Sequence, residues 1–394
     1  MTSNWNQQAQ QLWQENKQLQ AIQHLVGIIN KTPRDKRNHL FVQLAYYFFL
    51  IKDYLSACAA FDEALKFAPD DETIIRNYAV CLSRSQQYDK ALSLVKKVDA
   101  KIIHDSYHYQ DFLCSTHKGL GNLTEAQQAG SRSLYLKHKE SCQKQAPFAL
   151  NKITKPSPSQ KNIISFSLWG NQPRYLRGAL DNLIASQYIY PNWQCRFYLD
   201  NSVPSDFINT LKAHGAEIIQ EPENQSLKHK LSWRFKVAND PSVYYFLVRD
   251  TDSVVNLREA MAVQDWQASG KAFHVMRDWW THTDLILAGM WGGIAGLLPD
   301  MKQSLSNYQS GVAETPNIDQ WFLRDCIWPL IYDESLIHDR YFNSYHAQAW
   351  PTPHNENSNE HVGQDLFTAR SEEQTKRLTY WINKLICLQV ASPK

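Results

Sequence analysis

Two carboxylates separated by one residue, Asp250 and Asp252, follow an apolar run at residues 244–248. Side chains two positions apart in an extended segment point the same way, so both can reach one ligand. Paired oxygens of this kind suit a hard divalent cation such as Mg²⁺ or Mn²⁺, whose other coordination positions phosphate oxygens and water can fill. A solvated turn has the same composition, and the spacing alone does not separate the two interpretations. The apolar run before the pair and the glycine-rich segment 289–293 after it favour a metal site.

The segments that must position this pair alternate between short apolar runs and helical patterns from residue 162 onward. The pattern predicts strands and intervening helices in this order: 163–168, helix 175–185, 195–200, helix 206–214, 216–220 and 243–248. Such alternation is typical of an α/β domain with a mostly parallel sheet. Ligands of these sheets bind beyond the carboxyl ends of the strands, which is where Asp250 and Asp252 are expected.

Two side chains outside this pair could bind an anion or a sugar. Arg234 lies on an expected helix before the fourth strand, and its guanidinium group matches phosphate oxygens. A surface salt bridge is the competing interpretation. Asp278 follows the apolar run 273–276, so it also lies at a strand end, where it could bind sugar hydroxyls. The glycines of 289–293 either let the backbone approach a ligand closely or form a tight turn.

A 34-residue period occupies the first third of the chain. Its clearest unit, residues 38–71, resembles the tetratricopeptide repeat position by position at Phe41, Leu44, Ala45, Phe48, Tyr54, Ala57, Phe61, Ala64 and Pro69. A second unit begins at Glu72, another copy lies upstream, and a weaker one runs from about 107 to 139. Stacked repeats predict a curved helical array, which could bind a partner protein, mediate a homodimer or serve only as a platform.

Composition excludes other classes of protein. The chain of 394 residues is too long for one small module, and its formal charge of +2 provides no basic field that would hold nucleic acid. No run approaches the ~18 apolar residues of a membrane span. The polar N-terminus lacks the pattern of a secretory signal. The seven cysteines form no C-x-x-C pair, which indicates reduced thiols. We therefore expect a cytoplasmic protein.

The chain also divides by composition. We expect a helical repeat domain at 1–140, a proline-containing linker at 141–160, an α/β domain at 161–368 and an amphipathic helix at 369–394. The apolar face of that last helix could pack on a domain, or dock at the inner face of a membrane near a lipid-linked acceptor. The expected fold class is thus an all-helical array followed by an α/β domain.

A set of motifs from Lys161 to about Gln364 resembles the nucleotide-sugar glycosyltransferases of the GT-A fold, especially a polysaccharide or capsule-type group with an R-D-x-D-S motif. The resemblance rests on segments 166–170, 196–200, 233–235, 249–253, 258–259, 269–271, 273–278, 289–292, 319–320 and 322–323. It implies a Rossmann-like domain with a mostly parallel sheet. It also implies transfer of a sugar from a nucleotide donor, a UDP-sugar first, to a hydroxyl acceptor with Mn²⁺ or Mg²⁺.

The same resemblance assigns roles to individual residues. Asp250 and Asp252 would hold the metal, with a third ligand from His338 or, as the second choice, His361. Contacts to the donor are expected from Trp169, Asp200, Arg234, Arg249, Asp250, Asp252, Trp291 and Gly292. Catalytic contacts are expected from Asp319, as the base for the acceptor hydroxyl, and from Asp278. Trp169 could instead belong to the core, and Asp319 could cap a helix at 320–327.

The expected acceptor is a surface glycan or a lipid-linked glycan, ahead of a protein. One rival function is a repeat scaffold whose α/β half binds a nucleotide sugar without turnover. Another is a metal-dependent phosphohydrolase or nuclease. The presence of both Asp250 and Asp252 argues against the first rival. The ordered motifs and the absence of a basic field argue against the second. Donor sugar, acceptor and stereochemical outcome stay open.

Overall fold

The chain divides into two compact units, Met1–Leu136 and Lys137–Lys394, in a computed structural model. The structure describes residues 5–143, 150–151, 157, 159–310, 317–353 and 360–365. The amphipathic helix expected at 369–394 lies outside these residues, as does much of the expected linker. Helix α9 continues to Gln143, so the first three residues assigned to the linker are helical.

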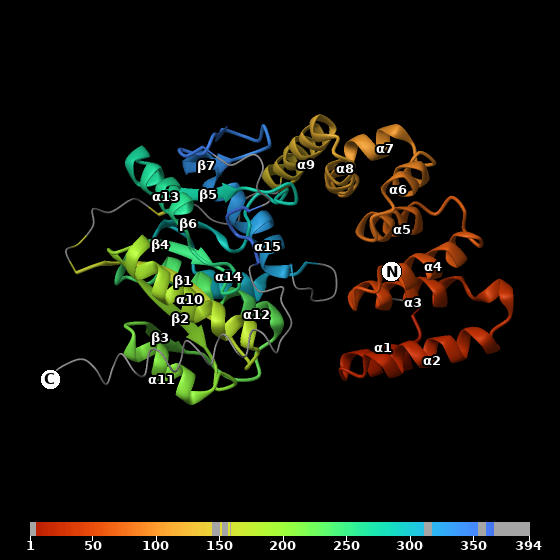
Figure 1. Ribbon diagram of the computed structural model, residues 1–394, viewed down its shortest axis with the longest axis horizontal. Coiled ribbons are helices and arrows are strands. Elements are labelled where there is room, and N and C mark those ends of the chain that lie inside the picture. The colour runs from red at the N-terminus through yellow and green to blue at the C-terminus, as the bar shows by residue number, and fades with distance from the viewer. Residues whose placement is uncertain are drawn as a thin grey trace. The chain divides into compact units, whose positions relative to one another are not determined.

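The first unit is helical throughout its described part (Figure 1). Its helices are α1 (Gln7–Gln14), α2 (Gln18–Lys31), η2 (Arg34–Lys36), α3 (Asn38–Leu50), α4 (Tyr54–Leu65), α5 (Glu72–Arg84), α6 (Tyr88–Val95), α7 (Ala100–Asp105), α8 (Tyr107–Leu120) and α9 (Leu123–Gln143), which continues into the second unit. The small residues of the 34-residue pattern, such as Ala45, Ala57 and Ala64, are fully buried in this unit's core. Close helix packing requires small side chains at such positions.

One short helix interrupts the expected regularity. Helix α7 comes between α6 and α8, and the sequence pattern did not predict it. The side chain of Asp99 caps it by accepting a hydrogen bond of 2.7 Å from the backbone N–H of Lys101, which satisfies an otherwise unpaired donor at the start of the helix.

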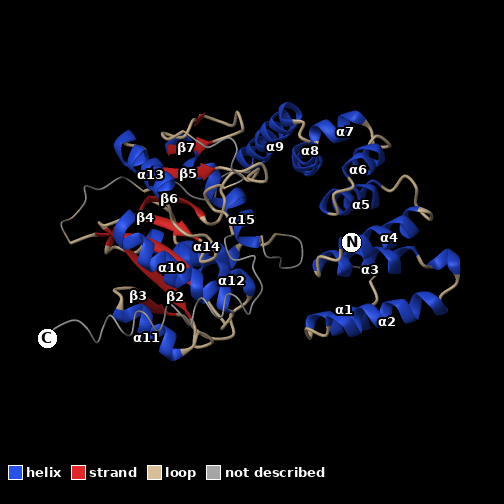
Figure 2. Cartoon of the chain, viewed as in Figure 1, coloured by secondary structure: helices blue, strands red, loops and turns tan. Residues whose placement is uncertain are grey.

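The second unit contains one eight-stranded sheet in the order β3-β2-β1-β4-β6-β5-β7-β8. Its strands are drawn in red in Figure 2, with helices around them. The strands are β1 (Lys161–Leu168), β2 (Trp193–Leu199), β3 (Glu217–Gln220), β4 (Val243–Arg249), β5 (Phe273–Arg277), β6 (Met290–Ile294), β7 (Ser335–Asp339) and β8 (Ala347–Gln348). The helical segments are α10 (Pro173–Ile189), α11 (Ser205–Ala213), α12 (Leu227–Ser232), η3 (Trp233–Asn239), α13 (Leu257–Ser269), α14 (Met301–Asn307), α15 (Ile318–Phe322), η4 (Leu323–Ile327), α16 (Trp328–Ile331) and η5 (Tyr332–Glu334).

The prediction of a mostly parallel sheet is confirmed. Strand β6 alone among the described strands runs antiparallel to its neighbours, β4 and β5. It contains the glycine-rich segment for which the sequence suggested a turn or a ligand contact. A side chain at Gly292 would collide with the carbonyl oxygen of Phe246, and one at Gly293 with the ring of Phe273. These two glycines therefore allow the central strands to pack closely.

The order of the strands locates the functional edge of the sheet. The chain leaves β1 for β2 and β3 on one side, then returns to pair β4 with the other side of β1. This reversal between β1 and β4 is the kind of switch point at which open α/β sheets bind ligands. Both strands are parallel, so Leu168 and Arg249 end at the same edge.

Strand β1 uses its two faces differently. Ile164, Phe166 and Leu168 share a hydrophobic core with α10, α11 and α13. The alternating residues Ser165 and Ser167 hold the helical turn η3. The hydroxyl of Ser165 donates to the carbonyl of Arg234 over 2.8 Å, and the hydroxyl oxygen of Ser167 accepts the backbone N–H of Arg234 over 3.0 Å. The backbone of Arg234 is thereby attached to the central strand.

Among the described residues, no disulfide joins the cysteines Cys58, Cys81, Cys114, Cys142, Cys195 and Cys326. No helix in the described ranges has both the length and the apolar composition needed to cross a bilayer.

Candidate active site

Two cavities meet at the carboxyl ends of β1 and β4. The first has a volume of about 240 Å³, and its lining includes Trp169, Tyr175, Thr251 and Asp252. The second has a volume of about 210 Å³, and its lining includes His282, Gly289, Asp319, Gln320 and Gly363. Leu231, Arg234 and Asp250 line both. A ligand in each cavity would therefore contact the same carboxylate and the same guanidinium group.

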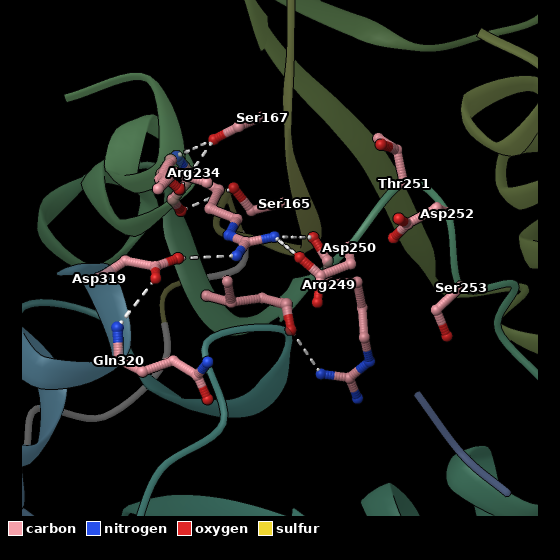
Figure 3. Close-up of polar contacts among 12 residues, drawn as sticks. Ser165, Ser167, Arg234, Arg249, Asp250, Thr251, Asp252, Ser253, Asp319 and Gln320 are labelled. Atoms are coloured by element: carbon pink, nitrogen blue, oxygen red, sulfur yellow. Dashed lines mark hydrogen bonds and ion pairs between the residues drawn. The ribbon is translucent and has the colours of Figure 1, made fainter. Parts of the chain in front are cut away.

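Arg234 lies between two carboxylates at this shared wall (Figure 3). Its Nη1 pairs closely with Asp250 and donates to the carbonyl of Arg249 over 3.0 Å, while its Nη2 lies 3.3 Å from Asp319 Oδ2. Arg234 and Asp319 are both buried. The pKa of Asp319 is raised to about 6, because burial and the negative charge of Asp250 raise it more than the positive charge of Arg234 lowers it. A carboxyl group with this pKa can accept a proton near neutral pH.

A second guanidinium group, that of Arg174, bridges the other aspartate of the pair to the C-terminal part of the chain. Its Nη2 lies 2.6 Å from Asp252 Oδ2 and 2.7 Å from Asp365 Oδ2. Burial raises the pKa of Asp252, and the negative charges of Asp250 and Asp365 raise it further. The carboxylates of Asp252 and Asp365 therefore repel each other, and Arg174 Nη2 lies between them.

Gly289 makes room for the carboxylate of Asp250. A Cβ atom at this position would lie 1.9 Å from Asp250 Oδ2. The first glycine of the glycine-rich segment therefore has a direct role at the site, in contrast to Gly292 and Gly293 within β6. The sequence suggested a close approach of the backbone somewhere in this segment, and the structure identifies the position.

Some of the residues expected to bind the donor line a cavity, and the others are buried in the protein. Trp169, Arg234, Asp250 and Asp252 line the first cavity. Asp200 is buried and accepts hydrogen bonds from Lys230 Nζ over 2.8 Å and from the backbone N–H of Ser202 over 3.1 Å. Burial alone would raise the pKa of Asp200, but Lys230 and Ser202 lower it overall, so the carboxylate is held ionised.

Arg249, Trp291 and Gly292 belong to the protein interior. Arg249 pairs with buried Glu259 over 3.0 Å and donates to the carbonyl of Trp291 over 3.1 Å. Trp291 is fully buried and packs edge-on against Phe235 and Phe246. The R-D-x-D-S motif therefore combines a structural arginine with two aspartates that line the cavities.

Asp278 is fully buried rather than open to a cavity. Its carboxylate pairs closely with Arg258 and accepts the backbone N–H of Val362 over 2.8 Å. Its own N–H donates to His282 Nδ1 over 3.0 Å. In this arrangement Asp278 positions two walls of the second cavity, because His282 and Gly363 both line it.

His338 is placed apart from the aspartate pair. It is fully buried in β7, with Nδ1 2.8 Å from His274 Nε2 and Nε2 3.0 Å from Asp265 Oδ2. The alternative residue, His361, stacks on Trp279 with a centroid distance of 4.5 Å. Within the described ranges, no group of three or more His, Cys, Asp or Glu side chains could hold a metal ion. Neither histidine therefore completes a three-ligand group with Asp250 and Asp252.

Sequence reasoning missed four residues of the site: Tyr175, which lines the first cavity; Arg174 and Asp365, which pair beside it; and His282, which lines the second. Arg174 and Tyr175 open the helix after β1, a position at which α/β proteins often bind ligands, and this signal could have identified them. Asp365 lies 113 residues beyond Asp252 with no motif around it, so only the fold reveals it.

Comparison with known proteins found no matching family model and no matching curated protein. Among solved structures, MamA from Desulfovibrio magneticus RS-1 is 20% identical over 32% of this chain and 71% of its own, with a TM-score of 0.30. A mutant O-GlcNAc transferase of Thermobaculum terrenum is 14% identical over 51% of this chain and 44% of its own, with a TM-score of 0.27. The mannosyltransferase PcManGT from Pyrobaculum calidifontis, in complex with GDP-Man and Mn²⁺, is 12% identical over 59% of this chain and 67% of its own, with a TM-score of 0.33.

Proposed function

We propose that this protein is a metal-dependent glycosyltransferase that moves a sugar from a nucleotide donor to a hydroxyl acceptor. The observation that carries the proposal is the meeting of two cavities at Asp250 and Arg234, with Asp319 lining the second. A transferase for two substrates needs such adjoining spaces, because the reacting atoms must come within about 3–3.5 Å of each other.

We assign the nucleotide donor to the first cavity. Trp169 and Tyr175 provide aromatic surface for a base, and Asp250 and Asp252 lie where the diphosphate would approach a bound cation. The glycine after Trp169, Gly170, has φ +74 and donates its N–H to Ser202 over 2.7 Å, which fixes the loop that carries Trp169. A UDP-sugar is the first donor to test.

The charges around the cavities fit a divalent cation. Among the described residues, the carboxylates of Asp250, Asp252, Asp319 and Asp365 gather around two guanidinium groups, those of Arg234 and Arg174, so the site is rich in negatively charged oxygens. Hard oxygen ligands of this type are those that Mg²⁺ and Mn²⁺ prefer. Asp250 and Asp252 would hold the cation. When bound, it would supply the positive charge that stabilises the departing diphosphate.

The residues of the chain perform the rest of the transfer. The acceptor oxygen forms a bond to the anomeric carbon of the donor, while the bond from that carbon to the phosphate oxygen breaks. The proton of the acceptor hydroxyl passes to Asp319 Oδ2, the oxygen that lies 3.3 Å from Arg234. Arg234 pairs with both Asp319 and Asp250 and so holds these two carboxylates in place at the second cavity. With its pKa raised to about 6, Asp319 can take up that proton near neutral pH.

Thermal unfolding with UDP, GDP and CMP, each with and without Mn²⁺, tests this function. A ligand that binds the folded state must stabilise it, by about 2.7 kcal/mol at roughly a hundredfold excess over Kd. We expect one nucleotide to stabilise the protein only with Mn²⁺, and the Asp250→Ala, Asp252→Ala double variant to lose this effect. Asp35→Ala, which changes an exposed aspartate in the first unit, is the control. Absence of stabilisation by every nucleotide at millimolar concentration would contradict the proposal.

A further inference from the structure

The second cavity contains hydrogen-bonding groups that the transfer described above does not use. Besides Asp319, its polar lining includes His282 and Gln320. His282 belongs to the loop between β5 and β6, and Gln320 belongs to α15. Gly363 contributes a third, separate segment of the chain to the same lining.

The hydrogen bonds of His282 determine where its proton lies. The backbone N–H of Asp278 donates to Nδ1 over 3.0 Å, so Nδ1 acts as an acceptor and carries no proton. The proton of a neutral imidazole must then be on Nε2. The pKa of His282 is lowered to about 3, mainly by burial and in addition by the neighbouring His361 and Arg277. The ring therefore stays neutral, with Nε2–H as a fixed donor, through the physiological range.

Gln320 provides the complementary acceptor. Its Oε1 is buried and has no hydrogen-bond partner among the described residues. Its backbone N–H is already used, since it donates to Asp319 Oδ1 over 2.9 Å. A buried amide oxygen without a partner is costly, because it loses its hydrogen bonds to water. A ligand that donates a hydrogen bond to this oxygen would remove that cost.

Asp278 makes the arrangement rigid. Its N–H holds His282, and its carboxylate holds the backbone of Val362, next to Gly363. Val362 is itself buried with Met276, Met290 and Trp350. Asp278 therefore links the His282 ring, with its Nε2–H group, to a well-packed part of the core before any ligand binds.

We propose that His282 and Gln320 recognise the acceptor, and that this acceptor is a saccharide whose neighbouring hydroxyl groups accept from His282 Nε2–H and donate to Gln320 Oε1. A hydroxyl group both donates and accepts, so a pair of adjacent hydroxyls matches one fixed donor and one unpartnered acceptor. Asp319, in the same cavity, is then left to take the proton of the reacting hydroxyl. This assignment rests on the proposed function, since it identifies the second substrate of the same reaction.

The test uses the full chain with ¹⁵N-labelled histidine, and the His282→Gln variant identifies the signals of His282. We expect Nε2 to be protonated and Nδ1 unprotonated from about pH 6 to about pH 8. Methyl glycosides of glucose, galactose and mannose at high millimolar concentration serve as probes, and at least one should shift the His282 signals. A protonated Nδ1 at neutral pH, or no shift with any probe in protein that binds nucleotide with Mn²⁺, would overturn the proposal.

Variants separate recognition from folding. His282→Leu and Gln320→Leu should each weaken saccharide binding about tenfold, the loss expected for one hydrogen bond, whereas His282→Gln keeps a donor and should recover part of it. All three should retain stabilisation by nucleotide and Mn²⁺, which reports the first cavity. His104→Gln, at an exposed histidine, is the control. Unchanged saccharide binding in His282→Leu and Gln320→Leu would contradict the assignment. If nucleotides fail to bind but the saccharide shift persists, the transferase function fails while the saccharide site stands.

Discussion

Two groups of one arginine and two aspartates lie at the carboxyl ends of the same strands, and they differ mainly in burial. Arg234 joins Asp250 to Asp319, and its side chain is 5% exposed. Arg174 joins Asp252 to Asp365, and its side chain is 32% exposed. Both arrangements place one guanidinium group between two carboxylates.

The difference in burial predicts that the ion pairs of Arg234 are needed for stability, whereas a ligand could replace those of Arg174. Removing the partner of a buried charge leaves that charge without water or counter-ion, which is costly. A partly exposed pair, such as that of Arg174 with Asp252, can replace some of its contacts by water at a lower cost. We therefore expect Arg234 to hold the site together, and Arg174 to give up its place between Asp252 and Asp365 when a cation binds.

The largest effect should come from removing Arg234. Arg234→Met leaves the buried carboxylate of Asp319 without its cation, and we expect the free energy of unfolding to fall by about 3–5 kcal/mol in urea titrations. Adding Asp319→Asn should recover much of the loss, because the unpaired charge is gone. Arg132→Met, which breaks the exposed pair with Asp105, should cost less than about 1 kcal/mol. Equal losses in Arg234→Met and Arg132→Met would remove the distinction between the groups.

The pH dependence of stability should report Asp319 next. Its pKa rises from 3.8 in the unfolded chain to about 6 in the folded one, so the folded state binds the proton more tightly. The resulting stabilisation is fully present below pH 3.8 and is lost as the pH rises through 6. Relative to Asp319→Asn, the wild type should lose about 3 kcal/mol over this interval. Parallel stability curves for the two proteins would contradict the raised pKa.

A methyl group beside Asp250 should have the next effect. In Gly289→Ala the new Cβ would lie 1.9 Å from Asp250 Oδ2, so either the carboxylate or the loop must move. We expect a loss of about 1–3 kcal/mol in unfolding free energy, together with loss of stabilisation by nucleotide and Mn²⁺. Gly27→Ala, in helix α2 with no atom within 4 Å of its Cβ, should instead stabilise by up to about 1 kcal/mol. Unaltered nucleotide binding in Gly289→Ala would show that the position of Asp250 is not critical.

The smallest change in stability should come from Arg174. Arg174→Met should cost about 1 kcal/mol, because its pair with Asp252, at 32% and 22% exposed, is partly screened by solvent. Calorimetry should show tighter Mn²⁺ binding in the variant, since no positive charge has to be displaced from Asp252 and Asp365. Arg177→Met removes the same charge from the same helix, where it pairs with Asp181, and should leave Mn²⁺ affinity unchanged. Weaker Mn²⁺ binding in Arg174→Met would mean that this arginine supports the cation site.

Much of the fold could be predicted because its signals are local. The run from 243 to 248 and the alternation around it predicted a strand of the parallel sheet, and β4 covers Val243–Arg249. Strand β6 was not predicted, because glycines usually indicate a turn. Gly292 and Gly293 lie in a strand because Phe246 and Phe273, which are distant in sequence, leave no room for a side chain there. Helix α7 was missed because it contains only six residues, too few for a periodic pattern.

The candidate site could be predicted only around the aspartate pair. Asp250 and Asp252 follow a recognisable strand, and Arg234 does pair with both Asp250 and Asp319, which line the second cavity with it. Trp291 and Arg249 lie in the interior. The sequence could not show this, because the residue type alone does not tell whether a side chain near a motif faces a ligand or the core.

The sequence by itself determined the alternation of strands and helices, the helical repeats and the aspartate pair, because hydrophobic periodicity and spacing are properties of neighbouring residues. The tertiary structure decided which distant groups join that pair. Arg174 meets Asp365 across 191 residues, and Asp278 holds Val362 across 84. It also decided which of two similar arginines is buried, since burial depends on what the rest of the chain packs around each guanidinium group.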